Sequence, residues 1–229
     1  MSITPLKHAL VTGCSSGIGE TVCLTLLAQG WKVTGLARRE VSFQHPHFRG
    51  IPLDITDTAK LTTVLETLPQ VDAVIHAAGM MKAAPLGQLD PQASEALWKL
   101  HIGVAEVLAD RLVEKMPDGG RIVLLGSRTS SGVAGRSQYV ATKSAMIGMA
   151  RSWAAELAPR GITVNVVAPG ATQTPMLDNP QRQSSPPRLP PIGRYIQPQE
   201  VADLVIYLLS PSAAAITGQQ LIICGGASL

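Results

Sequence analysis

The sequence has few charged residues and no cluster of them. Only 15% of its 229 residues are charged, and the net charge of +3 is spread along the chain without a Lys/Arg block. Proteins that bind nucleic acid or an anionic membrane surface carry concentrated positive charge. We therefore expect no nucleic-acid partner and no membrane partner, although a small positive bias is compatible with a phosphorylated cofactor.

Cysteines and long apolar runs are also scarce. Cys14, Cys23 and Cys224 are widely separated and lie among small or apolar residues, which indicates reduced packing residues rather than disulfides. His45 and His47 have no further Cys, His or acid cluster nearby to complete a zinc site, so no metal is expected. No apolar run approaches a membrane span and no leader pattern opens the chain, so we expect a cytoplasmic protein.

What the sequence does have is a regular alternation of short apolar runs and helical segments. At 45% hydrophobic residues, it is long enough for one well-buried core and short for two domains. Alternating strands and helices predict an α/β domain over residues 1–229, with a doubly wound parallel sheet of about seven strands and helices on both faces. Strands are expected at 9–12, 32–36, 51–55, 71–75, 122–125, 162–170 and 220–223. Helices are expected from the first glycine turn to residue 27 and at 57–68, 91–116, 137–157 and 198–209, with a short loop at 41–50 in place of a crossover helix.

A glycine-rich turn, TGCSSGIG, follows the first expected strand. Its glycines permit a tight turn and close backbone approach, and the free N–H groups at the start of the next helix form a site for a pyrophosphate. An ordinary β–α connection can share this pattern, but a second strand directly afterwards favours a dinucleotide site. The expected contacts are Gly13, Ser15, Ser16, Gly17, Ile18 and Gly19.

The second expected strand runs into Ala37, Arg38 and Arg39, with no carboxylate at these three positions. In dinucleotide folds an acid near this point bonds the ribose 2′-hydroxyl, whereas an arginine accommodates a 2′-phosphate. We therefore expect NADP(H) in preference to NAD(H). The alternative is that the two arginines are ordinary solvent-exposed residues at the end of a strand.

Two further strand ends supply candidate cofactor contacts. Asp54 ends the third expected strand and could accept a hydrogen bond from an adenine amino group. The small residues of the HAAG motif would let a cofactor pass close to the backbone at the carboxyl edge of the sheet. The residues added to the expected site are Asp54, Ile55, Ala77, Ala78 and Gly79.

A Ser, a Tyr and a Lys lie within the short stretch SRTSSGVAGRSQYVATK, residues 127–143. Tyr139 and Lys143 are four residues apart at the start of an expected helix, so their side chains leave the same face. A nearby ammonium lowers the pKa of a phenol from about 10 toward the working pH, where proton transfer is most effective. Ser127 follows an apolar strand and could place its hydroxyl beside the same reacting oxygen. Taken alone, the Tyr–Lys pair also fits a surface helix.

Residues 171–198 contain seven prolines and little periodicity. A loop of this length in a compact domain is usually functional or mobile. Because it follows the carboxyl end of an expected strand, we predict that it is a substrate lid.

In this order and spacing, the motifs resemble the short-chain dehydrogenase/reductase family over essentially the whole chain. They are TGCSSGIG at 12–19, the pair at 54–55, HAAG at 76–79, the serine at 127, YVATK at 139–143, VNVVAPG at 164–170 and ITGQQLIICGG at 216–226. The resemblance implies a Rossmann-type fold with Tyr139 as general acid in reduction and base in oxidation. It implies that Ser127 bonds the substrate oxygen and that Lys143 binds the nicotinamide ribose and tunes Tyr139. It also implies contacts with the nicotinamide end from Pro169, Gly170, Thr172 and Thr174 and, in NADP-dependent relatives, a 2′-phosphate contact at Arg38.

The chain departs from the family pattern at three points. His101 stands where the family usually has an asparagine that helps hold a water in a proton relay. A histidine could relay a proton with its own pH dependence, or could be a buried structural imidazole. His76 also replaces a common asparagine, which weakens the assumed support of the central strand. Ser127 lies one residue closer to Tyr139 than is usual.

The function implied is that of an NADP(H)-dependent oxidoreductase that interconverts a carbonyl and a secondary alcohol on a small or medium, fairly apolar molecule. We also expect a homodimer or homotetramer packed through two long helices. One alternative is an NAD-dependent dehydrogenase of cyclic alcohols or dihydrodiols, which the short loop after the second strand suggests and Arg38 opposes. Another is a dinucleotide-binding sensor without catalysis, which should lack the Tyr or the Lys. Reduction of substrates on acyl carrier protein would need a basic patch, for which Arg128 and Arg136 are candidates.

Overall fold

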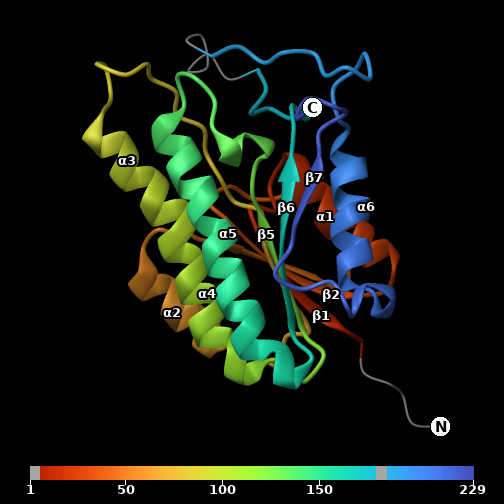
Figure 1. Ribbon diagram of the computed structural model, residues 1–229. Coiled ribbons are helices and arrows are strands. Elements are labelled where there is room, and N and C mark those ends of the chain that lie inside the picture. Colours follow the sequence, from red (N-terminus) through yellow and green to blue (C-terminus); the bar gives the residue numbers. More distant parts are fainter. Residues whose placement is uncertain (1–5, 179–184) are drawn as a thin grey trace, which may run out of the picture.

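A seven-stranded parallel sheet lies at the centre of the molecule (Figure 1). The computed structural model describes residues 6–178 and 185–229. The strand order is β3-β2-β1-β4-β5-β6-β7, so the chain changes its winding direction between β1 and β4. The strands are β1 (His8–Thr12), β2 (Lys32–Ala37), β3 (Phe48–Pro52), β4 (Ala73–His76), β5 (Arg121–Leu125), β6 (Thr163–Pro169) and β7 (Gln220–Ile223). The expected Rossmann-type, doubly wound α/β sheet is confirmed.

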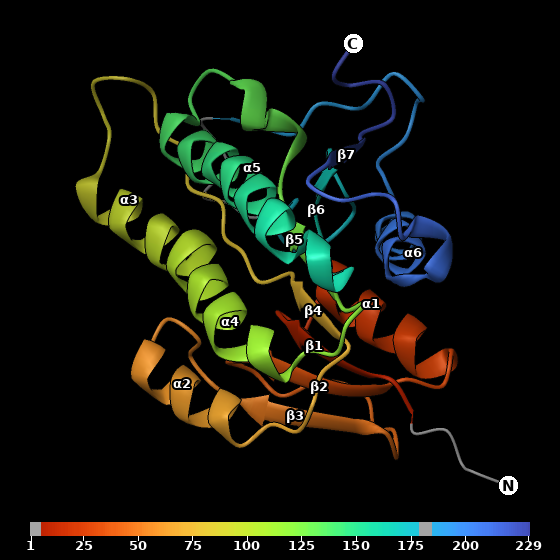
Figure 2. The same cartoon turned by 60° about the horizontal axis from the view of Figure 1, so that its bottom comes forward.

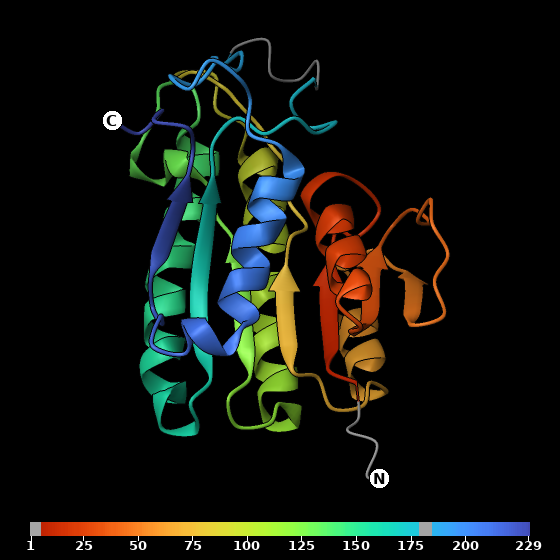
Figure 3. The same ribbon diagram turned by 90° about the vertical axis from the view of Figure 1, so that its right-hand side faces the viewer.

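Helices cover both faces of this sheet. On one face lie α1 (Gly17–Ala28) and α6 (Pro198–Leu209), which pack against each other (Figure 3). On the other lie α2 (Thr58–Glu66), α4 (Val104–Leu112) and α5 (Ser137–Leu157) (Figure 2). The central strands are buried on both sides, so their side chains divide between two apolar cores. In β1, for example, Leu10 belongs to the core under α2, α4 and α5, whereas Val11 belongs to the core under α1 and α6.

The third strand was expected at 51–55 and lies instead at Phe48–Pro52. Its register pairs Val33 with Phe48 and Ala37 with Pro52. Phe48 packs on Phe43 with ring centroids 4.7 Å apart, which anchors the start of the strand within the stretch that was expected to be a loop. Pro52 lacks an N–H, and such a residue is tolerated on an edge strand. As a result, Asp54 and Ile55 lie beyond the strand end rather than in it.

The long helix expected over residues 91–116 changes its hydrogen bonding twice. It begins as α3 (Pro91–Trp98), where Asp90 caps the N-terminus by accepting from Gln92 N at 2.9 Å. A π-helical turn follows at Lys99–Gly103, in which the N–H of Val104 donates to the carbonyl of Lys99, and α4 follows before a 3-10 turn at Val113–Lys115. A π turn holds one more residue than an α turn, and such turns are common at functional sites. This one contains His101.

The proline-rich segment leaves the sheet after β6 and returns to start α6. Its two ends pair, because Gln173 N donates to Ile196 O at 2.8 Å and Ile196 N donates to Ala171 O at 3.0 Å. The segment is therefore closed at its base, over the carboxyl ends of β6 and β7. Residues 179–184 of the expected lid lie outside the described residues.

None of the helices in the described ranges is long and apolar enough to cross a bilayer.

Candidate active site

One cavity of about 730 Å³ opens at the carboxyl end of the sheet. The loops after β4, β5 and β6, the start of α5 and the proline-rich segment all contribute to its walls. This is the edge at which open α/β sheets bind ligands. Of the residues expected in the site, it is lined by Ile18, Ala77, Gly79, His101, Ser127, Tyr139, Lys143, Pro169, Gly170, Thr172 and Thr174.

Tyr139 and Lys143 lie one turn apart on α5, as expected. Both are almost fully buried, and Lys143 Nζ lies 5.8 Å from the centroid of the Tyr139 ring. The same ammonium donates to the carbonyl of Leu125, at the end of β5, at 2.7 Å. Burial lowers the pKa of Lys143 from 10.5 to about 7. The positive charge that was expected to act on Tyr139 is therefore half lost at about pH 7 and is present in full only well below that pH.

Ser127 begins a short 3-10 turn directly after β5. Its Oγ lies 2.8 Å from Thr129 Oγ1 and accepts from the Thr129 N–H at 3.2 Å. Both side chains are buried. When the Ser127 hydroxyl donates to a substrate oxygen, Thr129 can become the donor to Ser127, since a hydroxyl is both donor and acceptor. Thr129 was not predicted from the sequence, in which only its position two residues after the serine could have indicated it.

His101 lies at the base of the cavity, within the π turn. Its Nε2 accepts from the Met80 N–H at 3.2 Å, so the ring proton is on Nδ1, which lies 2.9 Å from Thr142 Oγ1. Burial first, and then the charge of Lys143, hold the pKa of His101 far below 6.5. The imidazole is therefore neutral in the working pH range. The pH dependence expected of a relaying histidine does not follow from this environment.

The His101 ring also fixes its neighbours. It meets the Tyr139 ring edge to face, with centroids 5.7 Å apart. A Cβ on Gly79 would lie 3.4 Å from His101 Nε2 and 3.9 Å from Lys143 Nζ. Gly79 therefore keeps a narrow space open between the histidine and the lysine.

His76 supports the central strand rather than weakening it. Its Nε2 donates to the carbonyl of Leu100 at 3.1 Å, and its Nδ1 accepts from Thr12 Oγ1 at 2.8 Å. Thr12 Oγ1 in turn accepts from the Ala78 N–H at 3.1 Å. Burial and the charge of Lys143 lower the pKa of His76 to about 3. A neutral histidine therefore ties β1 and β4 to the helix that carries His101.

The glycine turn packs tightly against the loop after β4. Gly13 has a φ of +72°, and a Cβ there would lie 2.8 Å from the backbone of Ala78. Gly17 also has a positive φ, +60°, and faces the Thr174 side chain. Ser16 precedes α1 without capping it, so the N–H groups of the first helical turn have no side-chain acceptor from the cap residue. These features fit a phosphate-binding turn.

Arg38 and Arg39 are both exposed at the end of β2, but they have different neighbours. Arg39 Nη2 donates to Ser16 Oγ at 3.0 Å, beside the glycine turn. Arg38 contributes to lowering the pKa of Asp54, which is held down mainly by hydrogen bonds from Thr56. At the end of β2, Arg39 thus lies beside the glycine turn and Arg38 lies near Asp54. Sequence position alone gave no means of separating them.

The three cysteines and the two histidines at 45 and 47 do not line the cavity. Cys14, Cys23 and Cys224 are buried free thiols. In residues 6–178 and 185–229, no group of three or more His, Cys, Asp or Glu side chains is arranged for a metal ion. His45 and His47 are therefore not part of such a group.

The chain is similar to known proteins over almost its full length. A family model described as enoyl-(acyl carrier protein) reductase matches residues 13–228. The 3-oxoacyl-(acyl-carrier-protein) reductase FabG of Escherichia coli is 36% identical over 236 residues, which are 96% of each chain. The (2S)-((R)-hydroxy(phenyl)methyl)succinyl-CoA dehydrogenase subunit BbsD of Thauera aromatica is 32% identical over 246 residues, with 97% of each chain covered.

Solved structures are also similar to this chain over almost its full length. A short chain dehydrogenase from Burkholderia cenocepacia in complex with NADP superposes with a TM-score of 0.88 and 30% identity, over 97% of this chain and 98% of that one. A short chain dehydrogenase family protein from Francisella tularensis superposes with a TM-score of 0.88 and 25% identity, over 96% and 98% of the two chains.

Proposed function

Because the chain belongs to the short-chain dehydrogenase/reductase family, a family of oxidoreductases, we propose that it is an NADP(H)-dependent enzyme that interconverts a carbonyl and a secondary alcohol. The observation that carries this proposal is the gathering of Ser127, Tyr139 and Lys143 around one cavity. A phenol and a hydroxyl at one reacting oxygen, with an ammonium near the phenol, are the groups that a carbonyl reduction needs.

Each of these side chains has a distinct role in the proposed reaction. A bound NADPH supplies the hydride to the carbonyl carbon. Tyr139 donates its proton to the carbonyl oxygen, so that a ketone becomes an alcohol, and takes the proton back in the reverse direction. Ser127 donates a hydrogen bond to the same oxygen and holds it toward Tyr139. Lys143 binds the cofactor ribose and, when charged, favours the ionised phenol.

His101 is proposed to position Tyr139 rather than to relay a proton. It contacts the Tyr139 ring directly and reaches the backbone of the same residue through Thr142. The His101 ring is neutral and is hydrogen-bonded at both nitrogens, so it holds a fixed position against the Tyr139 ring.

The NADP(H) preference is proposed from Arg38 and Arg39 at the end of β2. Support comes from the Arg39–Ser16 hydrogen bond beside the glycine turn and from the absence of an acid at 38 or 39. The Burkholderia cenocepacia relative has been solved with NADP. The cofactor would be held by the glycine turn, the two arginines, Asp54 and Ile55, the segment 77–79, and the stretch from Pro169 to Thr174. An NAD-dependent dehydrogenase of cyclic alcohols or dihydrodiols remains the alternative.

A second candidate function is reduction of 3-oxoacyl groups on acyl carrier protein. It is favoured by the name of FabG. The description of the family model also names acyl carrier protein, but with an enoyl group as the group reduced. Co-migration of this protein with acylated carrier protein, at physiological salt, would separate it from reduction of free small molecules.

The family also suggests a homodimer or homotetramer packed through the helices α4 and α5. Light scattering on the purified protein would measure the assembly. A monomer at micromolar concentration would end this part of the proposal.

Fluorescence titration with NADPH and NADH, followed by an assay of NADPH oxidation with a panel of ketones, tests the proposed activity. We expect NADPH to bind more tightly than NADH and at least one ketone to be reduced. If neither nucleotide binds, the oxidoreductase proposal fails and a sensor with another ligand takes its place.

A further inference from the structure

The active-site cavity carries positive charge that the proposed reaction does not use. Besides Lys143, the charged side chains that line it are Arg128, Arg136 and Arg188, and no described Asp or Glu lines it. The lining also includes a set of apolar side chains, namely Met80, Met81, Val133, Met176, Leu177, Leu189 and Pro191. A cavity with one sign of charge and apolar walls strongly favours a ligand of the opposite charge.

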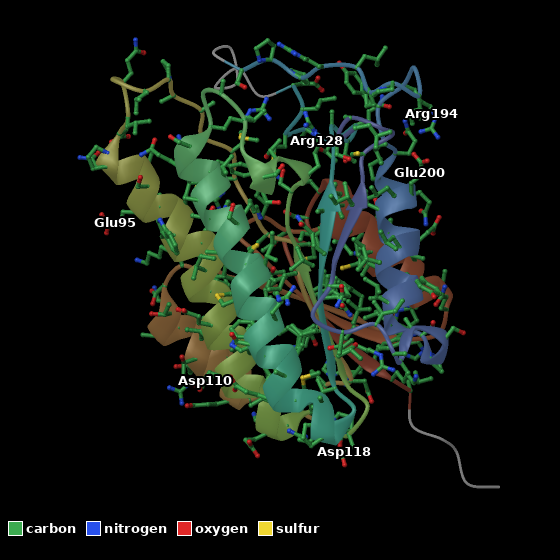
Figure 4. The ribbon with its side chains drawn as sticks, in the orientation of Figure 1. Glu95, Asp110, Asp118, Arg128, Arg194 and Glu200 are labelled. Carbon is green, nitrogen blue, oxygen red and sulfur yellow. The ribbon has the colours of Figure 1, made fainter. Side chains whose placement is uncertain are left out.

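Arg128 is the arginine placed nearest to the chemistry in the chain, because it directly follows Ser127. It is half-buried and lines the cavity at the carboxyl end of the sheet (Figure 4). In the described ranges it makes no hydrogen bond or ion pair. A partly buried guanidinium normally finds an acid or a set of carbonyls, since losing water without a partner is costly.

Two arginines outside the cavity are paired instead, the exposed Arg194 and the partly buried Arg160. Arg194 pairs with both carboxylate oxygens of Glu200, at 2.7 and 2.9 Å (Figure 4). Arg160 donates to Asp118 and to two backbone carbonyls. Neither of these arginines lines the cavity. Arg128 therefore keeps its donors available inside the cavity, where a ligand can reach them.

Arg136 has a different setting, at the N-terminus of α5. Its Nε donates to Ser185 Oγ at 2.7 Å and its Nη2 donates to Ser185 O at 2.9 Å. These bonds attach the returning part of the proline-rich segment to the helix that carries Tyr139. Arg136 and the exposed Arg188 thus add positive potential to the cavity that Arg128 also lines.

We infer that the substrate of this enzyme carries a carboxylate or phosphate group, which Arg128 binds, and an apolar chain that lies against the methionines and Leu177. The inference rests on the proposed function and specifies its substrate class. A guanidinium donates two parallel hydrogen bonds to either anion, so it fixes the orientation of the substrate as well as its charge. With the anion held at Arg128, the carbonyl is presented to Ser127 in the adjoining part of the cavity.

The test compares ligands that share a six-carbon chain and differ in the charged or neutral group at its end. Hexanoate, hexyl phosphate and neutral hexanamide are titrated by calorimetry into the protein saturated with NADP⁺ and into the free protein. We expect hexanoate or hexyl phosphate to bind at least about tenfold more tightly than hexanamide to the wild type. The preferred anion distinguishes a carboxylate substrate from a phosphate substrate.

Arg128→Gln should abolish this preference, because glutamine keeps a polar side chain without the charge. Arg49→Gln is the matched control, since Arg49 is exposed on the edge strand β3 and does not line the cavity. Equal affinity of the wild type for hexanamide and both anions, or an unchanged preference in Arg128→Gln, would overturn the inference.

The same variants are titrated with NADPH. We expect Arg128→Gln to retain wild-type NADPH affinity; a large loss would show that Arg128 serves the cofactor and would also overturn the inference. If the wild type binds no nucleotide, the proposed function fails. The anion titrations of the free protein then still decide whether Arg128 is an anion site.

Discussion

His101 Nδ1 donates a hydrogen bond to Thr142 Oγ1 at 2.9 Å, and the Thr142 hydroxyl donates to the backbone carbonyl of Tyr139 at 2.9 Å. Because Nε2 is occupied by the Met80 N–H, the histidine cannot gain a second proton without losing that bond. The chain of hydrogen bonds on the Nδ1 side ends at a carbonyl oxygen, which has no proton to pass on. This arrangement fixes the proposed acid and does not deliver protons to it.

His101→Asn should therefore lower kcat/KM by about tenfold without changing the shape of its pH profile, since the imidazole does not titrate near pH 6.5. Thr142→Val should lower kcat/KM in the same way, whereas Thr142→Ser should restore it because the hydroxyl is kept. The measurement is kcat/KM from pH 5.5 to 9. An acid limb that disappears in His101→Asn would instead identify the histidine as a titrating relay.

We expect Lys143 to lower the free energy of unfolding at neutral and acid pH. A lysine in the unfolded chain holds its proton to about pH 10.4, whereas burial lowers the pKa of Lys143 to about 7. Between these values the unfolded state binds more protons, so this group makes the free energy of unfolding rise as pH rises through that range. Lys143→Met should therefore be more stable than wild type at pH 6, by on the order of 4 kcal/mol.

Urea unfolding of both proteins at pH 6 and pH 9 measures this effect. The stability difference should shrink at pH 9, where the wild-type amine is neutral. A difference of the same size at both values would mean that Lys143 does not titrate between them. Lys143→Met should also lose turnover, which is the usual cost of stabilising an active site.

Thr129 should matter for catalysis only through its hydroxyl. Thr129→Val keeps the shape of the side chain but removes the hydrogen bond to Ser127 Oγ, so kcat should fall by about three- to tenfold. Thr129→Ser should retain near wild-type kcat, and NADPH affinity should be the same in both variants. Equal kcat for Thr129→Val and wild type would show that Ser127 needs no help from Thr129.

The cofactor preference should depend on Arg38 and Arg39. Replacing either by aspartate removes a cation and adds an acid where a 2′-phosphate is proposed, so NADPH affinity should fall by about ten- to a hundredfold. NADH affinity should stay within about threefold of wild type. Fluorescence titrations of Arg38→Asp, Arg39→Asp and the control Arg49→Asp measure this. A parallel loss of both nucleotides would indicate damage to the glycine turn instead.

The fold was largely predictable because its signals are local. Apolar runs at β1, β4 and β6 are buried on both faces, and helix ends are marked by Asp57, Asp90 and Pro198. The edge strand β3 was misplaced, since it is half-exposed and has no continuous apolar run. Its position depends on the Phe43–Phe48 contact and on pairing with β2, which are tertiary effects.

The site was predictable only where spacing along one element sets the geometry. Tyr139 and Lys143 lie on the same face because α5 is a regular helix. The π turn around His101 was not predicted, because it changes the hydrogen bonding of a helix without interrupting the helix. The Arg39–Ser16 bond, the Thr129 contact and the low pKa of Lys143 arise from folding and burial and could not be read from the chain.

The most direct test of the proposed chemistry is the rate of NADPH oxidation by Tyr139→Phe with a ketone that the wild type reduces. Phenylalanine keeps the ring and its contact with His101 but removes the proposed proton donor. We predict unchanged NADPH affinity, unchanged thermal unfolding and a rate at least about a hundredfold lower. A folded, NADPH-binding Tyr139→Phe that reduces the ketone at a rate near that of wild type would contradict the account.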